Sequence, residues 1–111
     1  MFKIIVGLKR HPSLTPTQFR EAWQAHGERV KQHPLTSKYL KKYVQNYALP
    51  EEYAKGEPPF DGVVEEWFES AEAYREFSSN PEYTGFLRAK ISEFTDNTKR
   101  SRIHVDEEVV L

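Results

Sequence analysis

Residues 14–33 read Leu-Thr-Pro-Thr-Gln-Phe-Arg-Glu-Ala-Trp-Gln-Ala-His-Gly-Glu-Arg-Val-Lys-Gln-His and predict a capped amphipathic helix. Thr15 fits the N-cap, Pro16 suits the first helical position, and Gln18 completes a capping box. The helix should end at His33, because a proline follows. Apolar residues at spacings of three and four form one buried stripe together with a histidine: Phe19, Ala22, Trp23, His26 and Val30.

His26 lies near the centre of this stripe, almost in line with Phe19 and Val30. Its imidazole should therefore point inward. An unperturbed imidazole titrates near neutral pH, with a pKa of ~6.5, so His26 could act as a general base or acid. The alternative is a core histidine that hydrogen-bonds a backbone carbonyl.

Strand and helix signals follow one another on both sides of this helix. Strands are predicted at residues 2–9, 39–48, 62–69 and 101–110, and a second helical region runs from Ser70 with a break at Asn80-Pro81. The proline-containing segment 49–60 is expected to be a loop that could serve as a lid. The order β-α-β-β-α-β predicts one ferredoxin-like α+β domain over residues 1–111, with a four-stranded antiparallel sheet.

The predicted strands are apolar on both sides, although helices in this topology cover only one face. Strand 62–69, for example, places Phe68 on one side and Trp67 on the other. A bare second face would expose a larger apolar patch than monomers usually tolerate. We therefore expect a homodimer in which two copies stack sheet against sheet about a two-fold axis.

The face that carries Trp67 is also expected to hold Glu65, Lys41, Gln45 and the tyrosine hydroxyls. Apolar walls with a few inward polar groups are typical of a small-molecule pocket. The carboxyl of Glu65 could have a raised pKa, or it could be neutralised by Lys41 or Arg102.

Two further residues of the predicted strands are candidates for the same pocket. Tyr43 could orient a substrate oxygen or donate a proton, or it could simply pack in an interface. Asn46 could contact a ligand or hold a loop.

Composition excludes several classes of function. The 111 residues contain 16 basic and 17 acidic side chains, and this near balance disfavours general nucleic-acid binding. The chain has no cysteine, which removes disulfides, thiolate nucleophiles and iron–sulfur ligation. No apolar run approaches the ~20 residues that a membrane span needs, so a cytoplasmic protein without a membrane partner is expected.

Cofactor and metal motifs are also missing from the sequence. It has neither a Gly-x-Ser-x-Gly elbow nor a glycine-rich phosphate loop. His26 and His33 are seven residues apart, ~10 Å along a helix, which is too far to share one metal ion. We therefore expect no metal and no cofactor.

Five blocks in the right order resemble proteins of the EthD-domain family. They are residues 3–10, Phe19-Arg20-x-x-Trp23-x-x-His26, Tyr43-Val44-Gln45-Asn46, Asp61-Gly62-Val63-Val64-Glu65-x-Trp67-Phe68, and the segment from Ser101-Arg102 to Val110. The resemblance implies the dimeric α/β-barrel superfamily, in which two ferredoxin-like subunits pair. The family's helix histidine corresponds to His26. Tyr47 stands where a histidine is frequent, and Glu66 stands where an apolar residue is common.

Similar proteins act in ethyl tert-butyl ether breakdown, dehydrate aromatic polyketide intermediates or isomerise muconolactone. The wider superfamily includes cofactor-free monooxygenases and haem-degrading enzymes. The resemblance therefore implies small-molecule chemistry without a fixed reaction type.

The leading hypothesis is a cofactor-independent dehydratase, cyclase or isomerase of a small, apolar, oxygenated metabolite such as an aromatic or lactone. His26 would transfer a proton, with Tyr43 and Asn46 positioning oxygen atoms. The remaining predicted substrate-binding residues are Trp23, Glu65 and Trp67. One alternative is an oxidoreductase of the monooxygenase or haem-binding type, and another is a non-catalytic metabolite-binding accessory protein.

Overall fold

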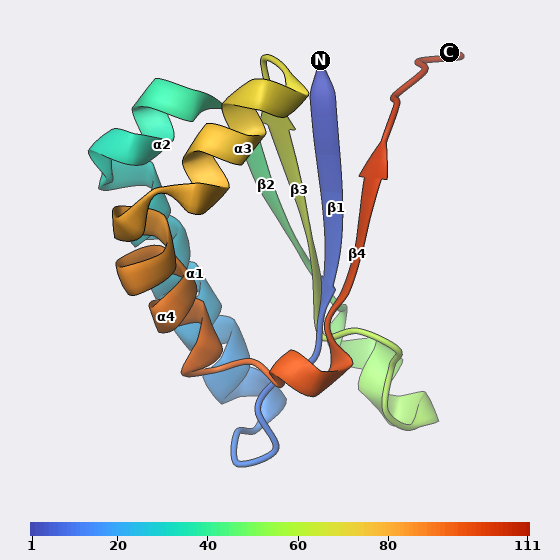
Figure 1. The fold of residues 1–111 in the computed structure, drawn as a ribbon. Helices are drawn as coiled ribbons and strands as arrows, with labels where there is room; N and C mark the ends of the chain where they lie inside the picture. Colours follow the sequence, from blue (N-terminus) through green and yellow to red (C-terminus); the bar gives the residue numbers. More distant parts are fainter.

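The computed structural model describes residues 1–111 and has two layers, a four-stranded antiparallel sheet and a layer of helices on one of its faces (Figure 1). The strands are β1 (Phe2–Leu8), β2 (Leu40–Tyr47), β3 (Gly62–Phe68) and β4 (Ser101–Val105), in the sheet order β2-β3-β1-β4. The helices are α1 (Pro16–Gln32), α2 (Pro34–Tyr39), α3 (Ala71–Ser79) and α4 (Arg88–Ser92). This is the predicted ferredoxin-like arrangement.

Helix α1 begins as its sequence predicts. The Thr15 side chain accepts a hydrogen bond from the Gln18 backbone N–H at 3.1 Å, and the Gln18 side chain accepts from the Thr15 N–H at 2.9 Å. Trp23, on the buried stripe, packs against Gly62 of β3. A Cβ at position 62 would lie 2.1 Å from the indole, so only glycine lets the helix approach the sheet this closely.

The hydrophobic core lies between the helices and the sheet. Its largest fully buried side chains include Phe19 and Trp23 from α1 and Phe68 from β3. The Phe19 and Trp23 rings lie 5.6 Å apart, and Phe19 also contacts Phe94 at 5.9 Å, so aromatic contacts join α1 to the segment after α4.

The strand register assigns each side chain of β2 to a face. Residues that pair directly across two strands lie on the same face of a sheet. Tyr43 pairs with Glu66, and Gln45 pairs with Val64. Since Val64 is buried in the core, Tyr43, Gln45 and Glu66 all face the helices.

Glu65 and Trp67 lie on the opposite face, where Trp67 pairs with Lys42. The predicted grouping of Gln45 and the tyrosine hydroxyls with Trp67 is therefore wrong. Alternation shows which residues of one strand share a face, but both strands are apolar on both sides. Their sequences thus gave no basis for matching the faces of β2 to those of β3.

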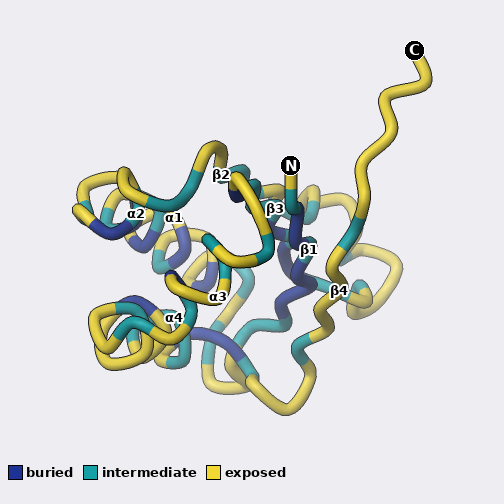
Figure 2. The backbone as a smooth tube through the Cα atoms, turned by 45° about the horizontal axis from the view of Figure 1, so that its top comes forward, coloured by how far each residue is buried: buried dark blue, intermediate teal, exposed yellow.

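Three elements differ from the sequence-based expectation. Tyr39 closes the short helix α2 instead of beginning a strand. The segment after β2 is not all loop, because Pro50–Lys55 forms a 3-10 helix, η1. The last strand ends at Val105, and residues 106–111 continue as an exposed tail (Figure 2).

The second helical region is split further than predicted. Ser70 caps α3 by accepting from the Ala73 N–H at 3.1 Å, as expected. After the break at Asn80-Pro81, the chain forms a π-helical turn, η2 (Tyr83–Leu87), before α4. A final 3-10 turn, η3 (Asn97–Lys99), leads into β4. None of the helices combines the length and the apolar character that a membrane span requires.

The sheet face away from the helices is called the outer face here, and no helix covers it (Figure 1). Its apolar residues come from all four strands: Ile5, Val44, Val63, Trp67, Ile103 and Val105. Lys3 also lies on this face, 2.8 Å from Glu107 and above the Trp67 ring at 4.4 Å. The outer face thus combines apolar strand residues with a small charged cluster.

Candidate functional site

Two adjoining pockets of about 50 and 60 Å³ lie between the helices and the sheet, and they are called the two compartments of the cavity. Residues of β3, α3, η2 and α4 line both compartments: Val64, Glu66, Phe77, Tyr83 and Ile91. His26 and Tyr43 line the first, whereas Arg100 and Arg102 line the second. Each compartment is large enough for a few water molecules and much smaller than a typical ligand site of ~300 Å³ or more.

His26 reaches this cavity from the middle of α1 and is 4% exposed. Its Nδ1 atom is buried without a hydrogen-bond partner, so the imidazole is not held by a backbone carbonyl through that atom. The Phe94 ring packs edge-on against it at 5.7 Å. Burial, with a smaller contribution from the Arg29 charge, lowers the pKa of His26 to about 4. The imidazole is therefore neutral at physiological pH.

Glu66 points into the same cavity from the centre of β3. No hydrogen bond or ion pair holds its carboxyl, and burial raises its pKa to about 7. The positive charges of Arg102 and Arg100 oppose that shift without cancelling it. A carboxyl with this pKa is present in both protonation states near neutral pH, which is the condition under which a general base or acid works best.

Tyr43 is held at the cavity wall by Gln45. The Gln45 Nε2 atom donates to the Tyr43 hydroxyl at 3.2 Å and to the Trp23 carbonyl at 3.0 Å, and the Tyr47 hydroxyl donates to Gln45 Oε1. Burial raises the pKa of Tyr43 well above its usual range, and the Glu66 charge adds to this effect. The phenol thus stays protonated and remains a hydrogen-bond donor.

Arg100 closes the far end of the cavity with an incomplete set of partners. Its terminal amine donates to Thr95 Oγ1 at 3.2 Å and Asn97 Oδ1 at 2.9 Å, but its Nε atom is buried without a partner. Burial lowers the pKa of Arg100 from its ordinary value. The cavity therefore has a carboxyl of raised pKa in its middle, a neutral imidazole on one side and a cation on the other.

The other predicted site residues do not lie in this cavity. Asn46 is on the outer face and donates to the Val63 carbonyl at 3.0 Å. Glu65 has its carboxylate 3.8 Å from Lys3 Nζ, so neither Lys41 nor Arg102 is its ionic partner. Lys41 instead lies 3.7 Å from Glu69.

The two tryptophans also lie outside the cavity lining. Trp67 donates to Glu107 on the outer face at 3.3 Å. Trp23 is buried in α1, packs against the Tyr47 ring at 4.8 Å, and leaves its Nε1 atom without a partner. The structure thus brings together His26 and Tyr43, the two predicted catalytic residues, and separates them from the outer-face residues.

Glu66, Tyr83 and Arg100 line the cavity but were not predicted as site residues. The sequence did contain a signal for Glu66, because it interrupts the apolar face formed by Val64 and Phe68. A charged residue on the core side of a strand is expensive and is usually paired or functional. No comparable signal marks Arg100, whose position depends on the turn before β4.

The sequence also matches a known protein family. A family model of the EthD domain matches residues 11–98. The chain belongs to the EthD domain family. The match includes His26, Tyr43 and Glu66, whereas Arg100 and β4 follow it in the sequence. No curated protein matches the chain.

Solved structures share the fold of this EthD domain at low sequence identity. A dimeric protein of unknown function from Bacteroides fragilis is 13% identical, with a TM-score of 0.70 over 96% of this chain and 95% of that one. A protein from Arabidopsis thaliana is 16% identical, with a TM-score of 0.69 over 100% and 99%. SnoaB, a cofactor-independent oxygenase from Streptomyces nogalater, is 8% identical, with a TM-score of 0.65 over 99% and 95%.

No group of three or more histidine, aspartate or glutamate side chains is placed to hold a metal ion. Glu66 and His26 share the cavity, but no third ligand of these types accompanies them. The chemistry that these residues can perform on their own is proton transfer.

Proposed function

We propose that this protein is a homodimeric enzyme that moves protons on a small, apolar, oxygenated metabolite such as an aromatic ketone or a lactone. The observation that supports this most is the pair of unpaired titratable groups in one cavity, with pKa values shifted in opposite directions. Such a pair divides the roles of base and hydrogen-bond donor between two residues at a single pH.

Glu66 is the base in this proposal, since its pKa of about 7 lies much closer to neutrality than that of His26. Its carboxylate takes a proton from a carbon next to a carbonyl, and the electron pair moves onto the carbonyl oxygen. The neutral imidazole of His26 and the phenol of Tyr43 donate hydrogen bonds to that oxygen. Arg100 and Arg102 add a positive potential that stabilises the resulting enolate.

The same proton then completes one of two reactions. In an isomerisation, Glu66 returns it to a different carbon of the enolate. In a dehydration or cyclodehydration, it goes to a hydroxyl group as the C–O bond breaks and water leaves. Both outcomes balance without an oxidant, a reductant or a metal ion.

A substrate of one or two rings needs more room than the cavity provides. In this proposal the helices that cover the cavity move for binding. Tyr83 and Leu87 lie in the π-helical turn η2 and line the wall, and π-helical turns are frequent at functional sites. Segment 49–60 contributes no residue to this cavity, so η2 is a better candidate for the moving element than the predicted lid.

The dimer in this proposal forms through the outer face. Ile103 is 59% exposed on this face, and Val109, Val110 and Leu111 of the adjoining tail are also exposed. The Bacteroides fragilis neighbour is described as dimeric, which supports the same assembly here. Light scattering should give about twice the 13.1 kDa chain mass, and Ile103→Glu should halve the measured mass. A wild-type mass equal to one chain would contradict the dimer.

Deuterium exchange in D₂O tests the proton transfer without knowledge of the natural substrate. The probes are 2-tetralone and α-angelica lactone, which have acidic C–H bonds next to a carbonyl. We expect the wild-type protein to exchange these protons at least about tenfold faster than buffer, and Glu66→Gln to lose that acceleration. His26→Gln should keep part of it, because it removes a hydrogen-bond donor and not the base.

Glu65→Gln is the matched control, because it makes the same chemical change one residue away on the outer face. It should exchange protons at the wild-type rate. If Glu66→Gln and Glu65→Gln both behave like wild type, or if the wild type does not exceed buffer, the proposed function is wrong.

A cofactor-independent oxygenase is the second candidate, because SnoaB shares this fold along nearly its whole length. A carbanion that Glu66 generates could react with O₂ as the oxidant. Oxygen uptake with the same two probes separates this reaction from isomerisation. Absorbance near the Soret band after purification tests a haem-binding protein. A metabolite-binding accessory protein would retain ligand affinity in His26→Ala and show no turnover in the wild type.

A further inference from the structure

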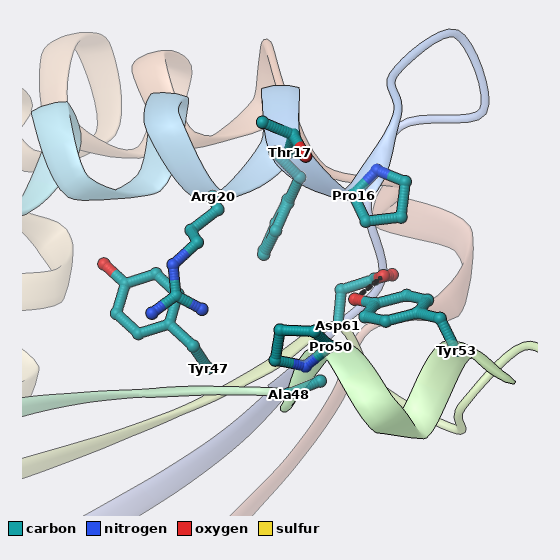
Figure 3. Close-up of a pocket in the computed structure, with 9 residues that line it drawn as sticks. Pro16, Thr17, Arg20, Tyr47, Ala48, Pro50, Tyr53 and Asp61 are labelled. Atoms are coloured by element: carbon teal, nitrogen blue, oxygen red, sulfur yellow. Dashed lines mark hydrogen bonds between the residues drawn. The ribbon is translucent and has the colours of Figure 1, made fainter.

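A second, larger pocket lies outside the proposed active site, at the end of the sheet where α1 begins (Figure 3). Its volume is about 260 Å³, close to the lower limit of typical small-molecule sites, ~300 Å³. The first turn of α1, the end of β2 and η1 form its walls. Its rings come from aromatic residues and prolines: Pro16, Phe19, Tyr47, Pro50 and Tyr53.

Arg20 provides the one cation of this pocket. Its guanidinium lies over the Tyr47 ring, with 4.5 Å between Cζ and the ring centroid, and faces the cavity (Figure 3). The ion pairs at this end of the molecule are made by Arg10 and Lys9 and do not involve Arg20. Stacking on an aromatic ring holds a guanidinium in place without neutralising it.

Asp61, the one carboxylate in the lining, is already neutralised. It is 2% exposed and accepts from Arg10 Nη1 at 2.8 Å and from the Tyr53 hydroxyl at 2.6 Å. Lys9 Nζ lies 3.1 Å from its other oxygen, and Glu57 balances the second positive charge of the cluster. Two cations and two carboxylates therefore cancel, and Arg20 is left as the uncompensated charge of the pocket.

We propose that this pocket binds a planar aromatic carboxylate of one or two rings. The ring system would lie between Pro16 on one side and Pro50 and Tyr53 on the other. The carboxylate would accept a bidentate hydrogen bond from Arg20, a geometry that a guanidinium favours. This site is separate from the cavity that contains Glu66, and no residue lines both.

A hydrogen-bonded path joins the two places. Tyr47 forms part of the new pocket and donates to Gln45, and Gln45 in turn donates to the hydroxyl of Tyr43 in the proposed active site. A ligand that moves the Tyr47 ring would therefore change the hydrogen bond that orients Tyr43.

The test is an NMR titration of the ¹⁵N-labelled full chain with 2-naphthoate and with its neutral analogue 2-naphthamide. We expect 2-naphthoate to shift the amide signals of Thr17, Arg20 and Ala48. The amide analogue should bind at least about tenfold more weakly, because it cannot form the charge-assisted pair. Added NaCl should weaken the binding of 2-naphthoate and leave that of 2-naphthamide unchanged.

Substitutions of Arg20 test whether its guanidinium binds the carboxylate of 2-naphthoate. Arg20→Gln should weaken 2-naphthoate binding about tenfold or more, and Arg20→Lys should fall between this variant and wild type, since lysine keeps the charge but not the planar fork. Arg20 is exposed, so these variants should fold normally. Arg75→Gln removes an exposed arginine from α3 and is the matched control, with affinity expected to be unchanged.

Three results would overturn the proposal. Equal affinities for 2-naphthoate and 2-naphthamide would show an apolar crevice without anion recognition. Signal changes confined to Val30, Leu87 and Ile91 would place the ligand in the other cavity. Absence of binding up to about 10 mM would correspond to an affinity too weak for a built site.

Discussion

Asp61, which is buried, and Glu66, which is half-buried in the cavity wall, are only five residues apart and differ completely in the partners of their carboxyls. Burial alone would raise the pKa of Asp61, but hydrogen bonds from Arg10 and Tyr53 lower it below its usual value. Glu66 has no hydrogen bond, and burial raises its pKa to about 7. A fully paired carboxylate holds elements of a fold together, whereas an unpaired one costs stability and is kept ready to exchange a proton.

The surroundings of the two carboxyls agree with this contrast. Asp61 joins the start of β3 to the end of β1, because the Arg10 backbone N–H and side chain both donate to it, each at 2.8 Å. Glu66 instead lies in the middle of β3 beside a cavity. One carboxyl is therefore expected to contribute to folding, and the other to chemistry.

Substitution of Asp61 should remove the network that it forms with Arg10 and Lys9. Asp61→Asn leaves Arg10 and Lys9 without their buried partner, and it should lower the free energy of unfolding by roughly 3 kcal/mol. Urea denaturation followed by circular dichroism measures the change. Asp106→Asn, in the exposed tail, is the control and should change the value very little. If Asp61→Asn lowered the free energy of unfolding only slightly, the network would not hold β1 and β3 together.

Glu66→Gln should increase the free energy of unfolding, whereas Asp61→Asn should decrease it. A carboxyl whose pKa rises from 4.5 to about 7 on folding destabilises the folded state once the pH exceeds both values. Removing it should therefore raise the free energy of unfolding at pH 8 by up to roughly 3 kcal/mol and change little at pH 4. Glu65→Gln, the outer-face control, should leave it nearly unchanged at either pH. A destabilised Glu66→Gln at pH 8 would show that the carboxylate has partners in solution.

The free energy of unfolding should depend on pH through both Glu66 and His26. Between pH 4.5 and 6.5, stability falls as pH rises because folded Glu66 keeps a proton that the unfolded chain releases. His26 has the opposite effect over the same interval, so its contribution to stability increases as the pH rises. The reason is that the unfolded chain binds a proton at His26, whereas the folded imidazole stays unprotonated.

These two contributions, each about 1.4 kcal/mol per pH unit at most, should nearly cancel in the wild type. In Glu66→Gln only the His26 contribution remains, so the free energy of unfolding should rise with pH. In His26→Gln only the Glu66 contribution remains, so the free energy of unfolding should fall with pH. Urea denaturation at several pH values measures both. Parallel profiles for the wild type and the two variants would contradict the pKa shifts.

The sequence predicted local structure better than it predicted the site, for reasons that particular residues show. The start of α1 depends on neighbours such as Thr15 and Gln18, whose capping interactions can be recognised from sequence. The inward direction of His26 also followed from helical spacing alone. Tyr43 was assigned to the wrong face, because its position depends on pairing with Glu66 across two strands.

Glu66 itself contributed to that error. A glutamate on a strand normally faces solvent, so its presence obscured which side of β3 meets the helices. Departures from the expected hydrophobic pattern concentrate at functional sites, and Glu66 is the residue here that departs most clearly. The sequence did not reveal the roles of Arg20 and Arg100, because the partners of an arginine side chain can be recognised only when its neighbours in space are known.

The Asp61 network can also be weakened at one hydrogen bond while its ion pairs are kept. Tyr53→Phe removes one donor to Asp61, a 2.6 Å hydrogen bond, and leaves those from Arg10. It should lower the free energy of unfolding by about 1 kcal/mol at neutral pH. With one donor fewer, the pKa of Asp61 should also move back toward its usual value.

The stability that Asp61 contributes is fully present above its ordinary pKa of 3.8 and is lost as the pH falls below it. Tyr53→Phe should therefore lose less stability on acidification than wild type. Tyr39→Phe, which removes a hydroxyl on α2 away from this network, is the control. If Tyr53→Phe were as damaging as Asp61→Asn, the hydroxyl and not the charge pairing would hold Asp61, and the contrast with Glu66 would be one of hydrogen-bond count alone.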